Sequence, residues 1–358
     1  MPHDAPLVAV VGAGVIGLSC AAALSARGAR VLLVGESHAG ESSPAAAGML
    51  APHIESNDTP ARALGVAARD RFPDWIAALE DATGVRIALL RNGVLELAPD
   101  DAGAMRARRS AASQWLEPDE VRALEPQLVA PHGALLHQDD GAVDNVALVE
   151  ALRRSVMRER QARVIDGEVV RISPGGLHPA IVTRSARYEV DRIVLAAGAW
   201  VNGIQGLPAP LPVEPLRGQM LALAGAPVGH VVYAPGVYLV PRAGTTLAGA
   251  TMERVGFEVA TTPDAQQAMQ GAALDAVPAL RGAPVLRAWS GLRPATPDLL
   301  PIVDVDPGLP ALIYACGHSR NGILLAPLTG EAVADLAFGV EPAHDLAPFT
   351  LRRFRPQE

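Results

Sequence analysis

Three glycines near the N-terminus, Gly12, Gly14 and Gly17, have the spacing of a turn that binds a pyrophosphate. The first permits a tight turn, the second lets backbone N–H groups approach the phosphates, and the third allows a helix to pack closely on a strand. The phosphates would lie at a helix N-terminus, where unpaired N–H groups and the helix dipole favour an anion. Ordinary loops can have the same glycine spacing, so the elements on either side must show whether this turn binds a nucleotide.

The residues around these glycines predict the strand, helix and strand of a nucleotide-binding βαβ unit. Residues 8–11 are apolar, 18–27 suit a helix, and 29–34 form a second apolar run. In such units an acidic residue about twenty positions further on binds the adenosine ribose. Here that count reaches Gly35, and Glu36 follows it. We therefore expect Glu36 near the ribose, with a solvated loop carboxylate as the alternative.

Two later segments repeat the pattern of a buried strand followed by small residues. Residues 193–200 read Ile-Val-Leu-Ala-Ala-Gly-Ala-Trp, with Gly198 after the strand. In residues 314–327 a strand enters a glycine-rich turn and then a helix that begins around Asn321. Small residues let backbone pass close to a cofactor, and a helix N-terminus favours an electron-rich ligand. Three such segments are typical of chains that bind FAD in an extended form.

The rest of the chain has a different pattern. Helices are expected at 61–83, 102–113, 119–124 and 146–160, and strands at 92–98, 163–172, 188–195, 213–223, 237–241 and 245–250. Strands outnumber helices between 210 and 292, which favours an antiparallel sheet. We predict an α/β protein with a Rossmann-type FAD-binding domain, a doubly wound βαβ core made of residues 1–82, 142–206 and 291–358. A second, α+β substrate domain built on an antiparallel sheet would comprise residues 83–141 and 207–290.

Composition limits the partners and the compartment. The chain of 358 residues has a net charge of −8 and no basic run, which argues against nucleic acid and against an anionic membrane surface. Residues 5–26 are apolar, but Asp4 precedes them and glycines interrupt them, so we expect a fold element rather than a signal peptide. No segment is expected to span a membrane. Two cysteines, Cys20 and Cys316, are too few for a disulfide framework, and we expect a cytoplasmic protein.

Eight motifs together carry a resemblance to a known family. The chain resembles the D-amino acid oxidase superfamily of FAD-dependent amine oxidases, and within it the glycine oxidases of thiamine biosynthesis. The resemblance covers nearly the whole length, and its most specific strings are Ala-Ala-Ala-Gly-Met-Leu and Arg-Asn-Gly-Ile-Leu-Leu-Ala-Pro. The motifs lie at 12–17, 44–50, 194–200, 215–219, 238–242, 249–252, 291–294 and 320–327.

The resemblance implies which residues hold FAD and which hold the substrate. The substrate carboxylate would bind Arg293, with Arg320 close by and Tyr238 and Met252 lining the pocket. The implied FAD contacts are Val15 and Ile16 in the phosphate turn, Glu36 at the ribose, Ser42, Ser43, Ala47, Gly48 and Met49 along the pyrophosphate and flavin, Val169 on adenine, and His318, Ser319, Arg320, Asn321, Gly322, Ile323 and Leu324 at the pyrimidine edge.

The implied chemistry requires no catalytic side chain and no metal. A neutral amine passes a hydride from Cα to flavin N5, and the flavin is the electron sink. The task of the protein is then positioning, for which a planar guanidinium is suited because it binds a carboxylate bidentately. Helix N–H groups near Asn321 would stabilise negative charge that develops on the reduced flavin. FAD is expected to be non-covalent, with both cysteines buried and free.

Each substrate assignment has a structural alternative. Arg293, which is expected in a loop, could instead pair with Asp298, and Arg320 could instead be a structural ion-pair partner. Tyr238 and Met252 could be packing residues with no role in binding. His318 is interpreted as scaffolding, because the mechanism needs no acid or base from it.

Two residues depart from the family pattern. Gly35 stands where the relatives usually carry a glutamate, which puts the ribose contact in doubt. Ser319 stands where they carry an aromatic residue, which would open space for an amine larger than glycine.

The expected function is oxidation of glycine, sarcosine or a small D-amino acid by FAD and molecular oxygen, with release of hydrogen peroxide. A broader D-amino acid or N-methyl amino acid oxidase is the first alternative, and an FAD dehydrogenase that uses an electron carrier is the second. The resemblance also implies a homo-oligomer, a tetramer.

Overall fold

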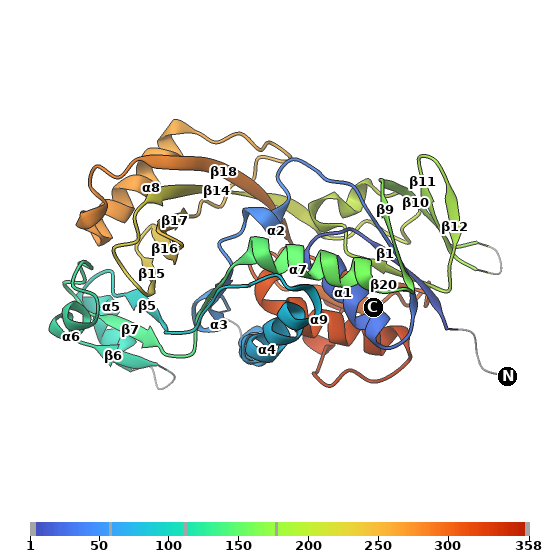
Figure 1. Ribbon diagram of the computed structural model, residues 1–358, viewed down its shortest axis with the longest axis horizontal. Helices are drawn as coiled ribbons and strands as arrows, with labels where there is room; N and C mark the ends of the chain where they lie inside the picture. The colour runs from blue at the N-terminus through green and yellow to red at the C-terminus, as the bar shows by residue number, and fades with distance from the viewer. Residues whose placement is uncertain (1–4, 57–58, 110–112, 176–177, 355–358) are drawn as a thin grey trace.

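The computed structural model describes residues 5–56, 59–109, 113–175 and 178–354. Two large sheets dominate it: a mostly parallel one, with long helices on one face, and a mostly antiparallel one at the other end of the molecule (Figure 1). No helix within the described ranges is both long and apolar enough to cross a membrane. The cavity described below lies where elements from the two ends meet.

The first sheet has six strands in the order β19-β20-β13-β1-β2-β9. Only β19 runs antiparallel to its neighbour. Alternate residues of each strand point to opposite faces, so Val8 and Val10 join one core cluster while Ala9 and Val11 join the other. The strands are β1 (Leu7–Val11), β2 (Arg30–Gly35), β9 (Ala162–Asp166), β13 (Arg192–Leu195), β19 (Ile302–Val305) and β20 (Leu312–Cys316).

Different structures cover the two faces of this sheet. Helices α1 (Val15–Ala26), α4 (Thr59–Thr83), α7 (Asn145–Arg158) and α9 (Gly322–Ala337) pack together on one face. The other face is covered by a three-stranded antiparallel sheet of β10 (Val169–Ser173), β11 (Ala180–Thr183) and β12 (Arg187–Glu189). The α/β class with a Rossmann-type FAD-binding core is confirmed.

The second sheet has eight strands in the order β18-β14-β17-β16-β15-β5-β7-β6, antiparallel except for the β15–β5 pair. One face packs on α8 (Pro263–Ala276), and the other faces the cavity. The strands are β5 (Val94–Leu97), β6 (Gln114–Leu116), β7 (Ala134–His137), β14 (Glu214–Ala224), β15 (Val231–Ala234), β16 (Val237–Arg242), β17 (Thr245–Gly249) and β18 (Val285–Ala295).

Short elements complete the described structure. A small sheet joins β3 (Met49–Leu50), β8 (Gly141–Val143) and β4 (Leu89–Leu90). The short helices are α2 (Ser42–Ala45), α3 (Pro52–Glu55), α5 (Asp101–Ala107) and α6 (Pro118–Leu124), and the 3₁₀ turns are η1 (Gly198–Gly203), η2 (Pro278–Leu280), η3 (Ala347–Phe349) and η4 (Leu351–Phe354). The expected helix over 102–113 ends at Ala107, and residues 110–112 lie outside the described ranges.

Two expected strands are each divided between two sheets. The strand predicted at 163–172 is β9 and β10, and the one predicted at 188–195 is β12 and β13. Between β12 and β13 the backbone changes partners, because the N–H of Val190 donates to Pro179 and the N–H of Asp191 donates to Leu7. The proposed domain division remains a prediction, and β18 runs across its boundary at 290–291.

Candidate active site

A cavity with about 740 Å³ of empty space, part of it open to solvent, lies between the N-terminal end of α1, the segment around α2 and β3, the start of α9, and the inner face of the eight-stranded sheet. Twelve of the residues expected to bind cofactor or substrate line it: Val15, Ser42, Ser43, Ala47, Gly48, Met49, Tyr238, Arg293, Ser319, Arg320, Gly322 and Ile323. The structure therefore brings the start of α1, residues 42–49 and the start of α9 to one place with Arg293, Arg320 and Tyr238, whereas the predicted cofactor segment at 193–200 does not line the cavity.

The phosphate turn has the backbone geometry that the glycine spacing predicts. Gly12 adopts a φ of 107°, and a Cβ there would overlap the carbonyl group of Ala196 at the end of β13. Gly14 is the N-cap of α1, and a Cβ added to it would lie 3.2 Å from Ser43 Oγ. Since the first turn of α1 carries no acidic residue, its N-terminus remains suited to an anion.

Arg242 holds the segment around Ala47 in place. Its Nη2 donates to the carbonyls of Ala47 (2.7 Å) and Val143 (2.8 Å), and its Nη1 donates to Asn145 Oδ1 (2.8 Å). Burial lowers the pKa of this arginine from its ordinary value. An arginine of the eight-stranded sheet thus fixes a backbone segment that lines the cavity from the other side. Arg242 ends the motif at 238–242, so that motif was the signal that could have identified it.

The turn before α9 presents a buried polar atom to the cavity. Ser319 has a φ of 47° and is only 6% exposed, and its Oγ has no hydrogen-bond partner among the described residues. A buried hydroxyl without a partner costs about 1–3 kcal/mol, so this atom is suited to a polar ligand in the cavity. Beside it, burial lowers the pKa of His318 to about 3, and its neutral ring bonds Thr329 Oγ1 at 3.1 Å.

Arg293 lies in strand β18, so its expected position in a loop is wrong. The following Pro294 suggested a loop, but β18 is an edge strand, where a residue without an N–H is tolerated. Room for the guanidinium comes from Gly218 on β14, since a Cβ there would overlap it. Asp298 does not pair with Arg293; it bonds Arg353 at 2.7 Å instead. Arg293 Nη1 donates to the carbonyl of Thr251 at 3.1 Å.

Arg320 has a carboxylate partner inside the cavity. It forms an ion pair with Glu55, whose side chain is 7% exposed, and its Nη2 donates to Tyr233 Oη at 3.4 Å. Burial alone lowers the pKa of Arg320, but the attraction of Glu55 outweighs this and raises it above its usual value. Arg320 therefore remains charged and fixed in position. It lines the cavity, as expected of a residue near the substrate, and it is also an ion-pair partner, as the structural alternative expected.

Tyr238 and Met252 occupy different positions. Tyr238 lines the cavity, donates to Met220 Sδ at 3.2 Å, and has its pKa raised to about 12 by burial, so it stays a protonated phenol. Met252 is 50% exposed and does not line this cavity; it lines an adjoining open groove that also contacts Tyr238.

Several predicted cofactor residues lie outside the cavity lining. Glu36 is exposed just beyond the carboxyl end of β2, Val169 is buried at the start of β10, and Gly198 begins η1 with a φ of 57°. The others are backbone supports or helix residues: Gly12, Gly14, Ile16, Gly17, His318, Asn321 and Leu324. Their roles in FAD binding remain predictions.

Six cavity residues were not predicted: Ala45, Ala46, Glu55, Gly218, Met220 and Gly291. Gly218 and Gly291 face each other on β14 and β18, and both belong to motifs that carry the family resemblance. Those motifs were therefore the signal that could have identified them. Glu55 and Met220 have no such local signal, because a tertiary contact alone brings each into the cavity.

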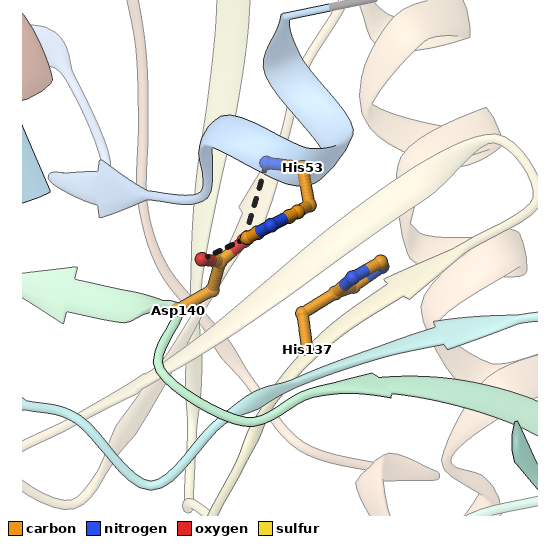
Figure 2. Close-up of side chains that lie close together, drawn as sticks. All are labelled: His53, His137 and Asp140. Atoms are coloured by element: carbon orange, nitrogen blue, oxygen red, sulfur yellow. Dashed lines mark hydrogen bonds and ion pairs between the residues drawn. The ribbon is translucent and has the colours of Figure 1, made fainter. Parts of the chain in front are cut away.

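Beside the site, two histidines and an aspartate lie together: His53, His137 and Asp140 (Figure 2). The His53 Nδ1 lies 3.0 Å from Asp140 Oδ1, and Arg69 Nη1 donates to the same oxygen at 2.7 Å. The imidazole of His137 is bonded at both nitrogens, to Ser113 Oγ (2.6 Å) and Glu96 Oε2 (2.9 Å). A guanidinium already bonds the aspartate, so the arrangement is a hydrogen-bonded cluster rather than an open ligand set.

Residues 8–336 match the model of the FAD dependent oxidoreductase family, DAO. The chain belongs to this family. Among similar proteins, the glycine oxidase of Pseudomonas putida is 34% identical over 360 residues, 96% of this chain and 97% of that protein. The crystal structure of glycine oxidase from Geobacillus kaustophilus superposes with a TM-score of 0.92 at 32% identity, covering 98% of this chain and 100% of that one.

Similar proteins also include longer chains. The bifunctional protein ThiO/ThiG of Synechocystis sp. is 36% identical over 361 residues, 97% of this chain but 54% of that protein. The chain spans about half the length of the first bifunctional relatives that it matches.

FAD is the cofactor of this family, and the walls of the cavity suit its flavin and pyrophosphate. The N-termini of α1 and α9 approach the cavity without an acidic residue in the first turn, and in α1 the N–H of Val15 donates to Ser43 Oγ at 3.0 Å. Glycines would let the backbone approach the cofactor closely, and the buried Ser319 Oγ has no hydrogen-bond partner among the described residues. Both cysteines are buried, and burial raises the pKa of each thiol. These features fit a member of the FAD dependent oxidoreductase family.

Proposed function

We propose that this protein oxidises glycine, and with it sarcosine and small D-amino acids, to the imino acid with formation of hydrogen peroxide. The likeness to glycine oxidases over nearly the full chain supports this, together with one observation: Arg293 and Tyr238 line the cavity beside the segments that would hold FAD. The imine of glycine would feed thiazole formation in thiamine synthesis, a role supported by the bifunctional ThiO/ThiG relatives.

The residues of the cavity have distinct tasks in this reaction. Bound FAD supplies the acceptor for the electron pair of the substrate. Arg293 holds the substrate carboxylate, and Gly218 leaves the space in which its guanidinium can turn toward that carboxylate. Tyr238 stays protonated, and its hydroxyl, which donates to Met220 Sδ in this structure, would turn to donate to the substrate. Arg320, held by its ion pair with Glu55, keeps a fixed position beside the substrate. No side chain is required as a base, provided that the substrate binds with a neutral amine.

The cofactor would be held without a covalent bond. Neither Cys20 nor Cys316 lines the cavity, and both thiols are buried with raised pKa values, so neither is a nucleophile at neutral pH. Purified protein should be yellow, and acid precipitation should release the flavin into the supernatant. Colour that stays in the pellet would contradict this.

A substrate panel tests the proposed function. Steady-state oxidation of glycine, sarcosine, D-alanine, D-proline and larger D-amino acids is measured with peroxide detection. We expect glycine and sarcosine to be oxidised with stoichiometric peroxide. A preference for larger D-amino acids would favour a broader oxidase, and turnover only with an artificial electron carrier would favour a dehydrogenase.

We further propose that the enzyme works in the cytoplasm as a homo-tetramer. The two free, buried cysteines are compatible with a reducing compartment. Light scattering on the purified FAD-loaded protein would give the oligomeric state, and a monomeric mass would overturn this part of the proposal.

A further inference from the structure

An open groove of about 900 Å³ adjoins the cavity. The two share Tyr238, Arg293 and Arg320, so a carboxylate bound at Arg293 would lie at their junction. Within the groove, the charged residues of the described lining are these two arginines and Glu96. A substrate held at Arg293 would therefore extend any long side chain into a groove that has a carboxylate on its wall.

Strand pairing places Glu96 in line with the substrate residues. Glu96 on β5 lies opposite Tyr233 on β15, and Tyr233 lies opposite Tyr238 on β16. Paired residues point to the same face of a sheet, and neighbouring strands are about 4.8 Å apart, so the Glu96 and Tyr238 backbones are about 10 Å apart. The stacked rings of the two tyrosines, with centroids 6.4 Å apart, form the wall between them.

A histidine and a serine fix the orientation of the Glu96 side chain. Its Oε2 lies 2.9 Å from His137 Nε2, and the Nδ1 of that ring lies 2.6 Å from Ser113 Oγ. A neutral imidazole satisfies all three groups when the serine hydroxyl donates to Nδ1 and Nε2–H donates to Glu96. The histidine thus orients the carboxylate, and 38% of the Glu96 side chain remains exposed to a ligand.

Arg320 does not balance the charge of the Glu96 carboxylate. Its ion pair is with Glu55, and its contact on the groove side is the Tyr233 hydroxyl. In the described part of the chain Arg293 forms no ion pair at all, so the groove has a cation at its inner end and an anion about two strands away. An amino acid with a basic side chain complements this charge pattern, since it carries an anionic carboxylate at one end and a cation on a flexible stem at the other.

We propose that the groove is a side-chain subsite for basic amino acids and that Glu96 determines this specificity. The proposal rests on amino acid oxidation at Arg293. The enzyme then accepts, besides glycine, D-amino acids whose side-chain ammonium reaches Glu96. D-lysine, with its four-carbon stem, spans the row from Tyr238 to Glu96, whereas a neutral side chain of equal length gains only the apolar contacts with the tyrosines.

The test compares kcat/KM for D-lysine and for D-norleucine, which has the same carbon chain without the ammonium. We expect wild type to favour D-lysine about fivefold, as suits a partly exposed ion pair. Glu96→Gln keeps an oxygen for His137 but removes the charge, and should bring the ratio close to one. Glu341→Gln, which removes an exposed carboxylate outside the groove lining, should leave the ratio at the wild-type value.

Equal kcat/KM for the two substrates in wild type, or a ratio that Glu96→Gln leaves unchanged, would overturn the subsite. Glycine turnover and ligand-induced thermal stabilisation of the FAD-loaded protein are recorded in parallel. Stabilisation by D-lysine that depends on Glu96, without oxidation of any amino acid, would support the subsite and contradict the proposed function. Glycine oxidation without any D-lysine preference would contradict the subsite alone.

Discussion

The two walls of the cavity are built by different means. The wall toward the six-stranded sheet consists of backbone and small side chains: the turn at Gly12–Gly17, residues 42–49 and the start of α9. The wall toward the eight-stranded sheet presents three long side chains, Arg293, Tyr238 and Met220, which project from three strands, with glycines on two of these strands between them. One wall is suited to a large cofactor that backbone groups can bind, and the other to a small substrate that side chains must orient.

This difference also separates the effects that mutations should have. Changes in the backbone wall should affect cofactor retention and stability together, because a close backbone approach has no room for added atoms. Changes in the side-chain wall should affect turnover while FAD stays bound. The predictions below test that separation, beginning with the largest effect.

Arg293→Ala should lower kcat/KM for glycine by about two to four orders of magnitude. Removing one partner of a desolvated ion pair costs about 3–5 kcal/mol, and each 1.4 kcal/mol is about tenfold. Arg293→Lys should also be impaired, because the charge stays but the planar fork is lost. FAD content should be close to that of wild type in both. The exposed Arg281→Ala is the control. Near-normal kinetics in Arg293→Ala would move the carboxylate site, with Arg320 as the next candidate.

Gly12→Ala should lose FAD and lower the free energy of unfolding by about 3 kcal/mol. The new Cβ overlaps the carbonyl of Ala196, and a φ of 107° is strained for alanine. Gly167→Ala is the matched control, since the nearest atom to its Cβ, Ile165 Cγ2, is 4.0 Å away. Flavin absorbance per protein and chemical unfolding measure both effects. If Gly12→Ala retained FAD and stability as well as Gly167→Ala, the backbone wall would not be closely fitted.

His318 should make the protein less stable in mild acid. Its pKa in the folded state is about 3, below its ordinary 6.5, because the ring is buried. Above pH 6.5 the ring is neutral in both states, whereas below it the unfolded chain binds a proton that the folded chain cannot. From pH 7.5 to pH 5 the loss is about 2 kcal/mol, at 1.36 kcal/mol per pKa unit.

The comparison that isolates this effect is wild type against His318→Gln, in urea unfolding at the two pH values. Wild type should lose about 2 kcal/mol more than the variant. Equal losses would mean that His318 is protonated in the folded protein and does not belong to the buried backbone wall.

Ser319→Phe should shift the preference between glycine and D-norvaline by about tenfold toward glycine. The ring would fill space beside the substrate, where each extra methylene contributes about 0.8 kcal/mol, and apolar pockets discriminate single methylenes only weakly. Ser319→Ala removes the hydroxyl without filling the space, so it should leave the size preference nearly unchanged. An unchanged ratio in Ser319→Phe would show that residue 319 points toward the cofactor instead.

The sequence predicted the backbone wall better than the side-chain wall. Residues 12–17 and 314–327 form contiguous segments in which strand, glycine turn and helix specify one another, so local pattern was sufficient. The ion pair of Glu55 with Arg320 and the space that Gly218 leaves for Arg293 arise only when separate strands and helices pack. Pro294 also misled the local interpretation, because its tolerance depends on β18 being an edge strand, which sequence pattern does not specify.

Anaerobic mixing of the purified FAD-loaded protein with glycine tests the central claim most directly. Positioning by Arg293 should suffice for electron transfer from glycine, so the visible flavin absorption should bleach in the first turnover. Oxygen should then restore the colour and release one hydrogen peroxide for each FAD. Absorption that persists with glycine, sarcosine and D-alanine alike would contradict the proposed oxidation of small amino acids at this cavity.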